Sequence, residues 1–164
     1  MIVRRAQVAD ATDAARTVAV VAPEGSLGTQ PPVDIEQRAG RFREIIERGE
    51  PAALWVLEDD DGLQVGHAAV EEVTPGVLTV GMAILPDARG RGGGRALLAA
   101  VQEHARASGA HKISLEVWTN NARAIALYAA AGFEVEGLRR DHYRRRDGSL
   151  RSTLIMAWRV EPAP

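Results

Sequence analysis

The feature that most constrains this chain is a glycine-rich segment at residues 84–95, Ile-Leu-Pro-Asp-Ala-Arg-Gly-Arg-Gly-Gly-Gly-Arg. An apolar stretch precedes it and a helical pattern follows. Glycine has no Cβ and tolerates positive φ, so successive backbone N–H groups can surround an anion. The start of a helix adds the positive end of its dipole at the same place. The segment therefore predicts a strand, an anion-binding loop and a helix in direct succession.

Composition bounds the class of protein. The chain has 164 residues, of which 46% are hydrophobic and 26% charged. This balance fits a single soluble globular domain over residues 1–164. The net charge of −2 gives no general attraction to nucleic acid or to an anionic membrane. Since no signal peptide or long apolar run is present, we expect a cytoplasmic protein without a membrane partner.

Helical and strand periods alternate along the chain, which favours an α/β or α+β layer architecture. Helices are expected after the cap Asp10, after the cap Asp34, after the glycine-rich segment, and after the cap Asn120 or Asn121. Residues 23–32 are expected to form a loop. Strands are expected at residues 1–6, 52–57, 63–73, 77–85, 113–118, 134–143 and 150–159.

Three interpretations compete for the glycine-rich segment. A Walker A loop needs lysine and then serine or threonine after its last glycine, and this chain has Arg95-Ala96 there. A Rossmann fingerprint needs its strand at the start of a βαβ unit, whereas this segment follows an antiparallel meander in mid-chain. An ordinary glycine-rich turn remains the third interpretation when the glycines are considered alone.

Two motifs in the expected order resemble the GNAT N-acetyltransferase superfamily. Arg-x-x-Gly-x-Gly at residues 89–94, after an apolar strand, is similar to its acyl-CoA-binding motif. Residues 121–133 look like its later motif, an asparagine-capped helix that bears Tyr128 and ends in Gly-Phe. The resemblance implies the GNAT acyl-CoA N-acyltransferase fold, with a twisted mixed seven-stranded sheet and helices on both faces. It points to the bacterial branch that acts on small amines or ribosomal proteins.

The resemblance also implies an activity, the transfer of an acetyl group from acetyl-CoA to a primary amine by direct transfer in a ternary complex. The backbone N–H groups of residues 90–95 suit the pyrophosphate, with nearby arginines available for charge-assisted contacts. The strand before the loop would pair with the pantetheine amides. The residues assigned to acetyl-CoA are Met82, Ala83, Ile84, Arg89, Gly90, Arg91, Gly92, Gly93, Gly94, Arg95, Asn121 and Tyr128.

Tyr128 and Glu116 are the candidate catalytic residues, both by resemblance. Tyr128 would lie near the thioester sulfur and protonate the departing thiolate, although a core tyrosine would show the same pattern. Because a phenol has a pKa of about 10 and a thiol about 8.5, a strengthening hydrogen bond matters as much as full transfer. Glu116 matches the proposed base of ribosomal-protein alanine N-acetyltransferases. Glu71, Glu72 and an ordered water are the alternative proton acceptors.

Other chemistry finds little support in the sequence. The four histidines show no close metal-ligand spacing, so we expect no metal, and the absence of cysteine removes the usual covalent nucleophile. A catalytically idle acyl-CoA-binding sensor is an alternative function. The arginine-rich segment at residues 139–148 raises an RNA-associated adaptor as a further alternative, but a solvated hairpin or a dimer contact explains it better.

The acceptor stays open. It could be a protein N-terminus, a free amino acid or an analogue of the phosphinothricin class, a polyamine or an aminoglycoside. In this superfamily variable loops build the acceptor pocket, which here means residues 23–32 and the last hairpin. Dimers are common in the superfamily, so the resemblance also admits a homodimer.

Overall fold

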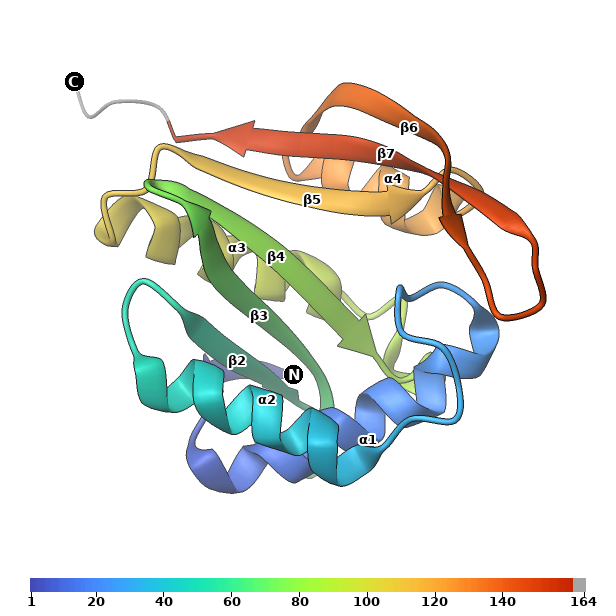
Figure 1. The fold of residues 1–164 in the computed structure, drawn as a ribbon. Coiled ribbons are helices and arrows are strands. Elements are labelled where there is room, and N and C mark those ends of the chain that lie inside the picture. Colours follow the sequence, from blue (N-terminus) through green and yellow to red (C-terminus); the bar gives the residue numbers. More distant parts are fainter. Residues whose placement is uncertain (161–164) are drawn as a thin grey trace.

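The computed structural model describes residues 1–160, and every strand and α-helix expected from the sequence is present there (Figure 1). Short 3₁₀ turns precede α1, follow α1 and follow β4. The elements are β1 (Ile2–Arg5), α1 (Ala11–Val21), α2 (Ile35–Arg48), β2 (Ala53–Glu58), β3 (Gln64–Thr74), β4 (Val77–Ile84), α3 (Gly93–Ala107), β5 (Lys112–Trp118), α4 (Ala122–Ala130), β6 (Glu134–Arg144) and β7 (Leu150–Arg159).

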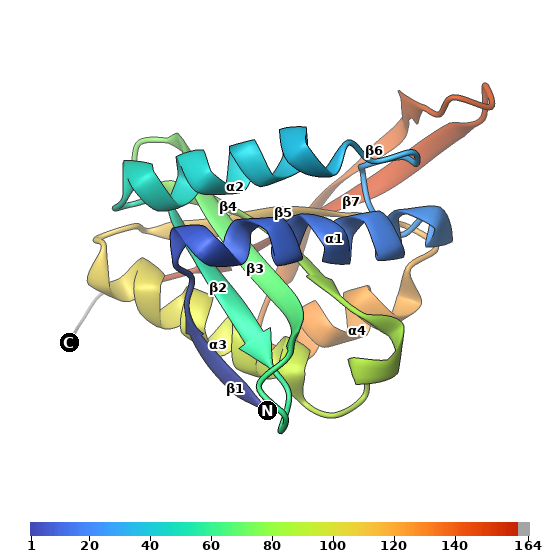
Figure 2. The same cartoon turned by 90° about the horizontal axis from the view of Figure 1, so that it is seen from below.

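The strands form one mixed sheet in the order β1-β2-β3-β4-β5-β7-β6. Only the β4–β5 pair is parallel, because α3 crosses over between these two strands. Helices α1 and α2 cover one face of the sheet, and α3 and α4 lie on the other (Figures 1 and 2). The expected twisted seven-stranded sheet with helices on both faces is therefore confirmed.

The sheet is nearly divided in the middle, between β4 and β5. These strands share only three residue pairs, which join Val77, Leu78 and Thr79 to residues 112–114. Beyond Thr79 the two strands diverge toward their carboxyl ends (Figure 1). Each strand keeps its other neighbour, because β4 pairs with β3 and β5 pairs with β7 along most of their lengths. An opening in the sheet results.

Two apolar cores hold the helices against the sheet. One lies on the α3 side and includes the fully buried Leu57, Leu97 and Ile113. The other lies under α1 and α2 and includes Phe42 and Leu54. Burying a side chain of this size contributes on the order of 2 kcal/mol each. The first core spans strands on both sides of the opening, and the second holds α1 and α2 against β2 and β3.

Side-chain caps explain where two of the helices, α2 and α4, begin. The Asp34 carboxylate accepts a hydrogen bond from the Gln37 N–H at 2.9 Å, and Asn121 does the same for Ala124 at 3.2 Å. These two expected caps are confirmed, and Asn121 rather than Asn120 is the cap of α4. The expected side-chain cap at Asp10 is wrong. The Asp10 carboxylate accepts a hydrogen bond from the Gln7 N–H at 2.6 Å and forms an ion pair with Arg4, and it does not bond to an α1 amide.

The reason is the 3₁₀ turn Val8–Asp10 that leads directly into α1. Asp10 already has helical backbone angles, with φ −75° and ψ −15°, and its carboxylate is directed back toward β1. No helix within residues 1–160 is long and apolar enough to cross a membrane.

Candidate active site

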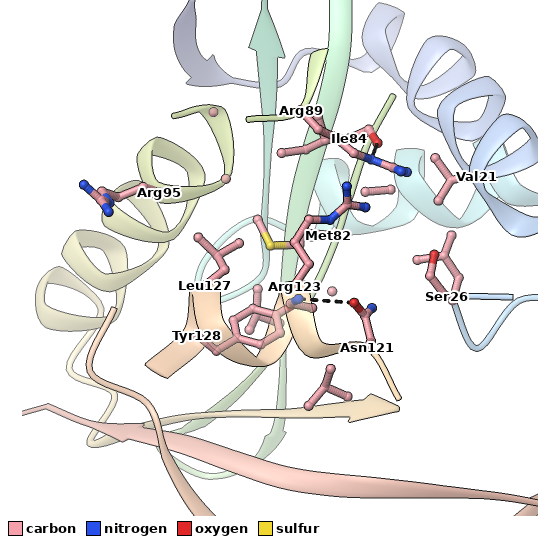
Figure 3. Close-up of a pocket in the computed structure, with 18 of the residues that line it drawn as sticks. Val21, Ser26, Met82, Ile84, Arg89, Arg95, Asn121, Arg123, Leu127 and Tyr128 are labelled. Carbon is pink, nitrogen blue, oxygen red and sulfur yellow. Dashed lines mark hydrogen bonds between the residues drawn. The ribbon is translucent and has the colours of Figure 1, made fainter. Parts of the chain in front are cut away.

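A cavity of about 630 Å³ occupies the opening between β4 and β5. Its walls come from the end of α1, the following loop at residues 26–28, the diverging half of β4, the glycine-rich segment, β5 and α4 (Figure 3). Elements from both halves of the sheet therefore contribute to one site. The expected cofactor residues all line it except Arg91, and both Glu116 and Tyr128 line it as well.

The backbone of β4 offers unpaired polar groups to this cavity. Leu85 donates its N–H to the Val65 carbonyl of β3 at 2.8 Å. This bond shows which alternate residues of β4 direct their backbone groups toward β3. By alternation, the N–H and C=O groups of Met82 and Ile84 point away from β3, toward the opening. The Ile84 carbonyl already accepts a hydrogen bond from Arg89 Nε at 2.8 Å. Met82 can thus bond an extended amide on both its groups, and Ile84 on its N–H.

The glycines after β4 serve two different purposes. Gly92 has φ 87°, a left-handed conformation in which an L side chain would be strained, and it lies directly before α3. Gly93 and Gly94 begin α3 and lie close against leucine side chains. A Cβ on Gly93 would collide with Leu57, and one on Gly94 would lie 2.9 Å from the Leu127 side chain. The first amides of α3 therefore lie unobstructed against the cavity.

The arginines of the segment differ in their surroundings. Arg89 binds both carboxylate oxygens of Glu24 through its Nη atoms, at 3.0 and 2.8 Å, and so ties the loop to the end of α1. Arg91 pairs with Asp60 at 3.0 Å and lies outside the cavity lining. Arg95 lines the cavity, is exposed and has no ion pair within residues 1–160.

Arg123 is a lining residue that sequence reasoning missed. It lies in the first turn of α4, two residues after the cap Asn121, and its side chain extends into the cavity (Figure 3). Asn121 also lines the cavity while its side chain caps the helix. The available signal was the position of Arg123 at a helix start next to an expected anion site.

Tyr128 lies on the buried face of α4 with a relative exposure of 9%. Its ring packs against Phe133 with the centroids 5.8 Å apart. Burial raises the pKa of Tyr128 to about 12. No group within residues 1–160 forms a hydrogen bond with its hydroxyl, which belongs to the cavity wall (Figure 3). The hydroxyl therefore keeps its proton at neutral pH and is free to donate it to a ligand.

Glu116 lies on the opposite wall, on β5, and its carboxylate is held by three donors. Its Oε2 accepts hydrogen bonds from the Tyr143 hydroxyl and the Thr153 hydroxyl, both at 2.8 Å. Its Oε1 lies 2.9 Å from Arg139 Nη1. Its neighbours on β5, Leu115 and Val117, are buried on the other face, as the alternation predicts. The carboxylate is thus fixed in orientation at the edge of the cavity.

The two alternative proton acceptors lie elsewhere. Glu72 accepts a hydrogen bond from the Gly76 N–H at 2.8 Å and so belongs to the β3–β4 turn. Glu71 faces α2, where it pairs with Arg48 at 3.0 Å, and it lines a second cavity on that side of the sheet. Of the three carboxylates, only Glu116 borders the cavity that contains Tyr128.

The β6–β7 hairpin closes over the loop after α1. Arg145 donates to the Gly28 carbonyl at 3.0 Å, and the Arg146 N–H donates to Gln30 Oε1 at 2.9 Å. Arg145 also stacks on Trp118, with its guanidinium carbon 5.3 Å from the ring centroid. Loop residues 26–28 line the cavity directly, whereas the hairpin acts on it by holding the loop.

Comparisons with known proteins agree on one family. The model of the Acetyltransferase (GNAT) family matches residues 22–133. An L-methionine sulfoximine/L-methionine sulfone acetyltransferase of Pseudomonas aeruginosa is 31% identical over 117 residues, which cover 68% of this chain and 67% of that protein. The ribosomal protein bS18 alanine N-acetyltransferase of Escherichia coli is 34% identical over 128 residues, 75% of this chain and 85% of that protein.

Solved structures give the same result. A ribosomal-protein-alanine N-acetyltransferase from Brucella melitensis superposes with a TM-score of 0.87 at 25% identity, over 98% of this chain and 100% of that one. A phosphinothricin acetyltransferase from Sinorhizobium meliloti, solved with acetyl-CoA, has the same fold with a TM-score of 0.87 at 24% identity, over 97% and 88% of the two chains. The chain belongs to the GNAT family and is an acetyltransferase that takes its acetyl group from acetyl-CoA.

Proposed function

We propose that acetyl-CoA lies in the opening between β4 and β5 and that the chain transfers its acetyl group directly to a primary amine. The observation that carries the proposal is the unpaired backbone of Met82, in a cavity that is also lined by the first residues of α3 and by Tyr128. One cavity thus offers a place for an extended amide chain, a place for an anion and a proton donor, which are the three partners that the acyl donor requires.

The chain offers distinct partners for each part of the donor. The N–H groups of residues 90–95 bind the pyrophosphate at the positive end of the α3 dipole. Arg95 and Arg123 add positive charge on either side. Arg89 contributes by fixing the loop rather than by its charge, since Glu24 already neutralises it. The Met82 backbone pairs with the pantetheine amides and thereby continues the sheet across the opening.

Tyr128 stabilises the sulfur as it leaves. A pKa of about 12 makes its phenol a weaker acid than an ordinary tyrosine, so complete proton transfer to a thiolate is uphill. A hydrogen bond from the hydroxyl to sulfur strengthens as negative charge develops, and in a cavity with little water it is worth more than in solution. The main role of Tyr128 is therefore hydrogen-bond donation to the leaving thiolate.

Glu116 takes up the proton that the amine must lose before it attacks. An alkyl ammonium has a pKa near 10, so it is almost wholly charged at neutral pH. Tyr143 and Thr153 both hold Oε2, which leaves Oε1 beside Arg139 as the oxygen with the fewest donors. The proton passes to this carboxylate, directly or through one water. Most of the acceleration comes from holding amine and thioester together.

The proposal also covers the class of acceptor, the catalytic unit, its location in the cell and the role of the last hairpin. The relatives act on a small sulfur-containing amino acid analogue and on a protein N-terminus, and we propose an acceptor from one of these two classes. The catalytic unit is the single domain of residues 1–164, acting in the cytoplasm as a monomer or a homodimer. Arg145 and Arg146 bind the loop after α1, so these two arginines support a structural role for the hairpin rather than an RNA contact.

The test is the release of free thiol from acetyl-CoA by the purified protein. The acceptors offered are free amino acids, L-methionine sulfone, polyamines, aminoglycosides and peptides with different N-termini. Because the chain has no cysteine, the protein adds no thiol background. Release with one class establishes the transfer and identifies the acceptor class. Acetyl-CoA binding without release from any acceptor would contradict the proposed transfer and favour a sensor.

A further inference from the structure

A second cavity, of about 350 Å³, lies on the opposite side of β4 from the α4 wall of the first cavity, beneath α1 and α2. Helices α1 and α2 extend across this part of the sheet (Figure 2). The two cavities share loop residues Leu27 and Gly28 and the stretch of β4 at residues 80–83. A molecule in the second cavity would therefore approach the donor site at β4.

Gly81 of β4 lines both cavities and has no side chain to lie between them. Its neighbours in the β3 register put residue 81 on the face that carries Ala69, toward α1 and α2. A Cβ built on Gly81 meets no atom within 4 Å, and its φ is not in the left-handed region. The glycine is thus required neither by packing nor by backbone conformation, and its missing side chain leaves space beside the acetyl end of the donor site.

The second cavity has an excess of positive charge at its α2 wall. Arg38 is partly buried there, and within residues 1–160 no carboxylate forms an ion pair with it. Its side chain donates a hydrogen bond to the Thr29 hydroxyl. Burial, and then the charge of Arg41, lower the pKa of Arg38. Glu71, the single carboxylate of the lining, is already bound by Arg48 at 3.0 Å.

The floor of the same cavity holds a buried histidine that no protein group satisfies. His67, on β3, has a relative exposure of 3%, and its Nδ1 is enclosed without a hydrogen-bond partner. Its ring contacts Phe42 edge-on, with the centroids 4.9 Å apart. Burial is the main cause that lowers the pKa of His67 to about 4, so the ring is neutral. A partly buried guanidinium without a carboxylate partner and a buried imidazole nitrogen without a hydrogen bond both indicate a missing polar ligand.

We propose that the amine acceptor carries a carboxylate and that Arg38 binds this carboxylate in the second cavity. This inference rests on the proposed function and specifies its acceptor as a free amino acid or a close analogue. Phe42 and Ile45 of α2 give an apolar surface for its side chain, and the amine points past Gly81 toward the donor. A polyamine should be a poor acceptor, because it brings only positive charge to Arg38, which has no carboxylate partner within residues 1–160.

The experiment compares each of the twenty free L-amino acids with its C-terminal amide in the thiol-release assay. In the wild type we expect kcat/KM to be about 10- to 100-fold higher for the best acid than for its amide, as a charge-assisted hydrogen bond gives. In Arg38→Gln this preference should disappear through a higher KM for the acid, while the amide is used as before. Arg43→Gln, on the same helix but paired with Glu36, is the matched control and should keep the preference.

A second variant tests the position of the acceptor. Gly81→Val should reduce transfer to every acceptor while the dissociation constant of acetyl-CoA changes little, since the new side chain points toward α1 and α2. Equal use of acid and amide, an unchanged preference in Arg38→Gln, or full activity in Gly81→Val would each overturn the inference. If peptides release thiol and no free amino acid does, the inference fails and the proposed function stands; if only polyamines do, the inference and the proposed acceptor classes fail while the transfer from acetyl-CoA to a primary amine stands. If nothing is acetylated, both fail.

Discussion

The Tyr143 hydroxyl donates a hydrogen bond to Glu116 Oε2 at 2.8 Å, and this contact joins the last hairpin to the wall of the active site. The two residues lie on strands that are not neighbours, because β7 stands between β5 and β6. Thr153 of β7 donates to the same oxygen. The position of the proposed proton acceptor therefore depends on three strands, and the last hairpin helps to hold its carboxylate.

Glu116→Gln should reduce turnover at pH 7 by about 100-fold, the usual contribution of a general base. Activity should partly recover as the pH rises toward 10, because the amine then loses its proton without help. The measurement is a pH profile of kcat/KM from 6.5 to 10. Glu72→Gln, at a carboxylate in the β3–β4 turn, is the matched control and should keep the wild-type profile. An unchanged profile in Glu116→Gln would assign the role to Glu71 or to water.

Tyr128→Phe should lower kcat by about 10- to 100-fold, because the variant cannot donate a hydrogen bond to the leaving sulfur. The dissociation constant of acetyl-CoA, measured by calorimetry, should change less than about twofold, since the ground-state thioester sulfur is a poor acceptor. With a pKa of about 12, the wild-type hydroxyl stays protonated, so its ionisation should cause no loss of activity below pH 10. Full activity of the phenylalanine variant would refute the donor role.

Gly92→Ala should weaken acetyl-CoA binding at least tenfold, because an alanine at φ 87° moves the amides that begin α3. Gly109→Ala is the matched control, since Gly109 has φ 75°, has open space at its Cβ and lies beyond the far end of α3. Both variants should lose about 1–2 kcal/mol of unfolding free energy. Calorimetric titration measures the affinity for acetyl-CoA, and thermal unfolding measures the loss of stability. Equal affinity of the two variants for acetyl-CoA would argue against the loop as the anion site.

His67 should make the folded state sensitive to acid. Its pKa is about 4 in the folded chain and about 6.5 when unfolded, so the unfolded state binds the proton first as the pH falls. The resulting loss of unfolding free energy is absent above pH 7, grows between pH 6.5 and 4, and reaches about 2 kcal/mol at pH 5. His67→Gln should lose this part of the pH dependence in urea unfolding at pH 7.5 and 5. An NMR titration that gives a pKa near 6.5 in the folded protein would contradict it.

The local motifs of the site could be predicted from the sequence because neighbouring residues determine them. The cap Asn121, the buried Tyr128 and the left-handed Gly92 each follow from residue type and spacing within one turn or helix. Side-chain partners across the fold could not be predicted in this way. Arg91 lies in the expected loop, yet its guanidinium pairs with Asp60 of the β2–β3 turn, which is distant in the chain.

The surroundings of a side chain on a helix are equally hard to predict from the sequence. Arg38 lies on a helix whose sequence pattern does not show which cavity its side chain borders. Arg38 reaches its cavity only because α2 packs across β3 and β4. Asp10 shows the opposite case, in which a good local cap is diverted by Arg4 of a neighbouring strand. Predictions from neighbouring residues were right where no residue distant in the chain offered the side chain a competing partner.

Because β4 and β5 share only three residue pairs, the proposed acetyl-CoA complex would complete the sheet where the free protein leaves it open. In the free protein the Met82 amide faces solvent at the centre of the fold, where other sheets have their most protected amides. When pantetheine pairs with it, exchange of this amide with deuterated water should slow, and the melting temperature should rise with acetyl-CoA concentration. In this proposal the acyl donor takes the place of a missing strand, so each catalytic cycle would add one element to the sheet and remove it again.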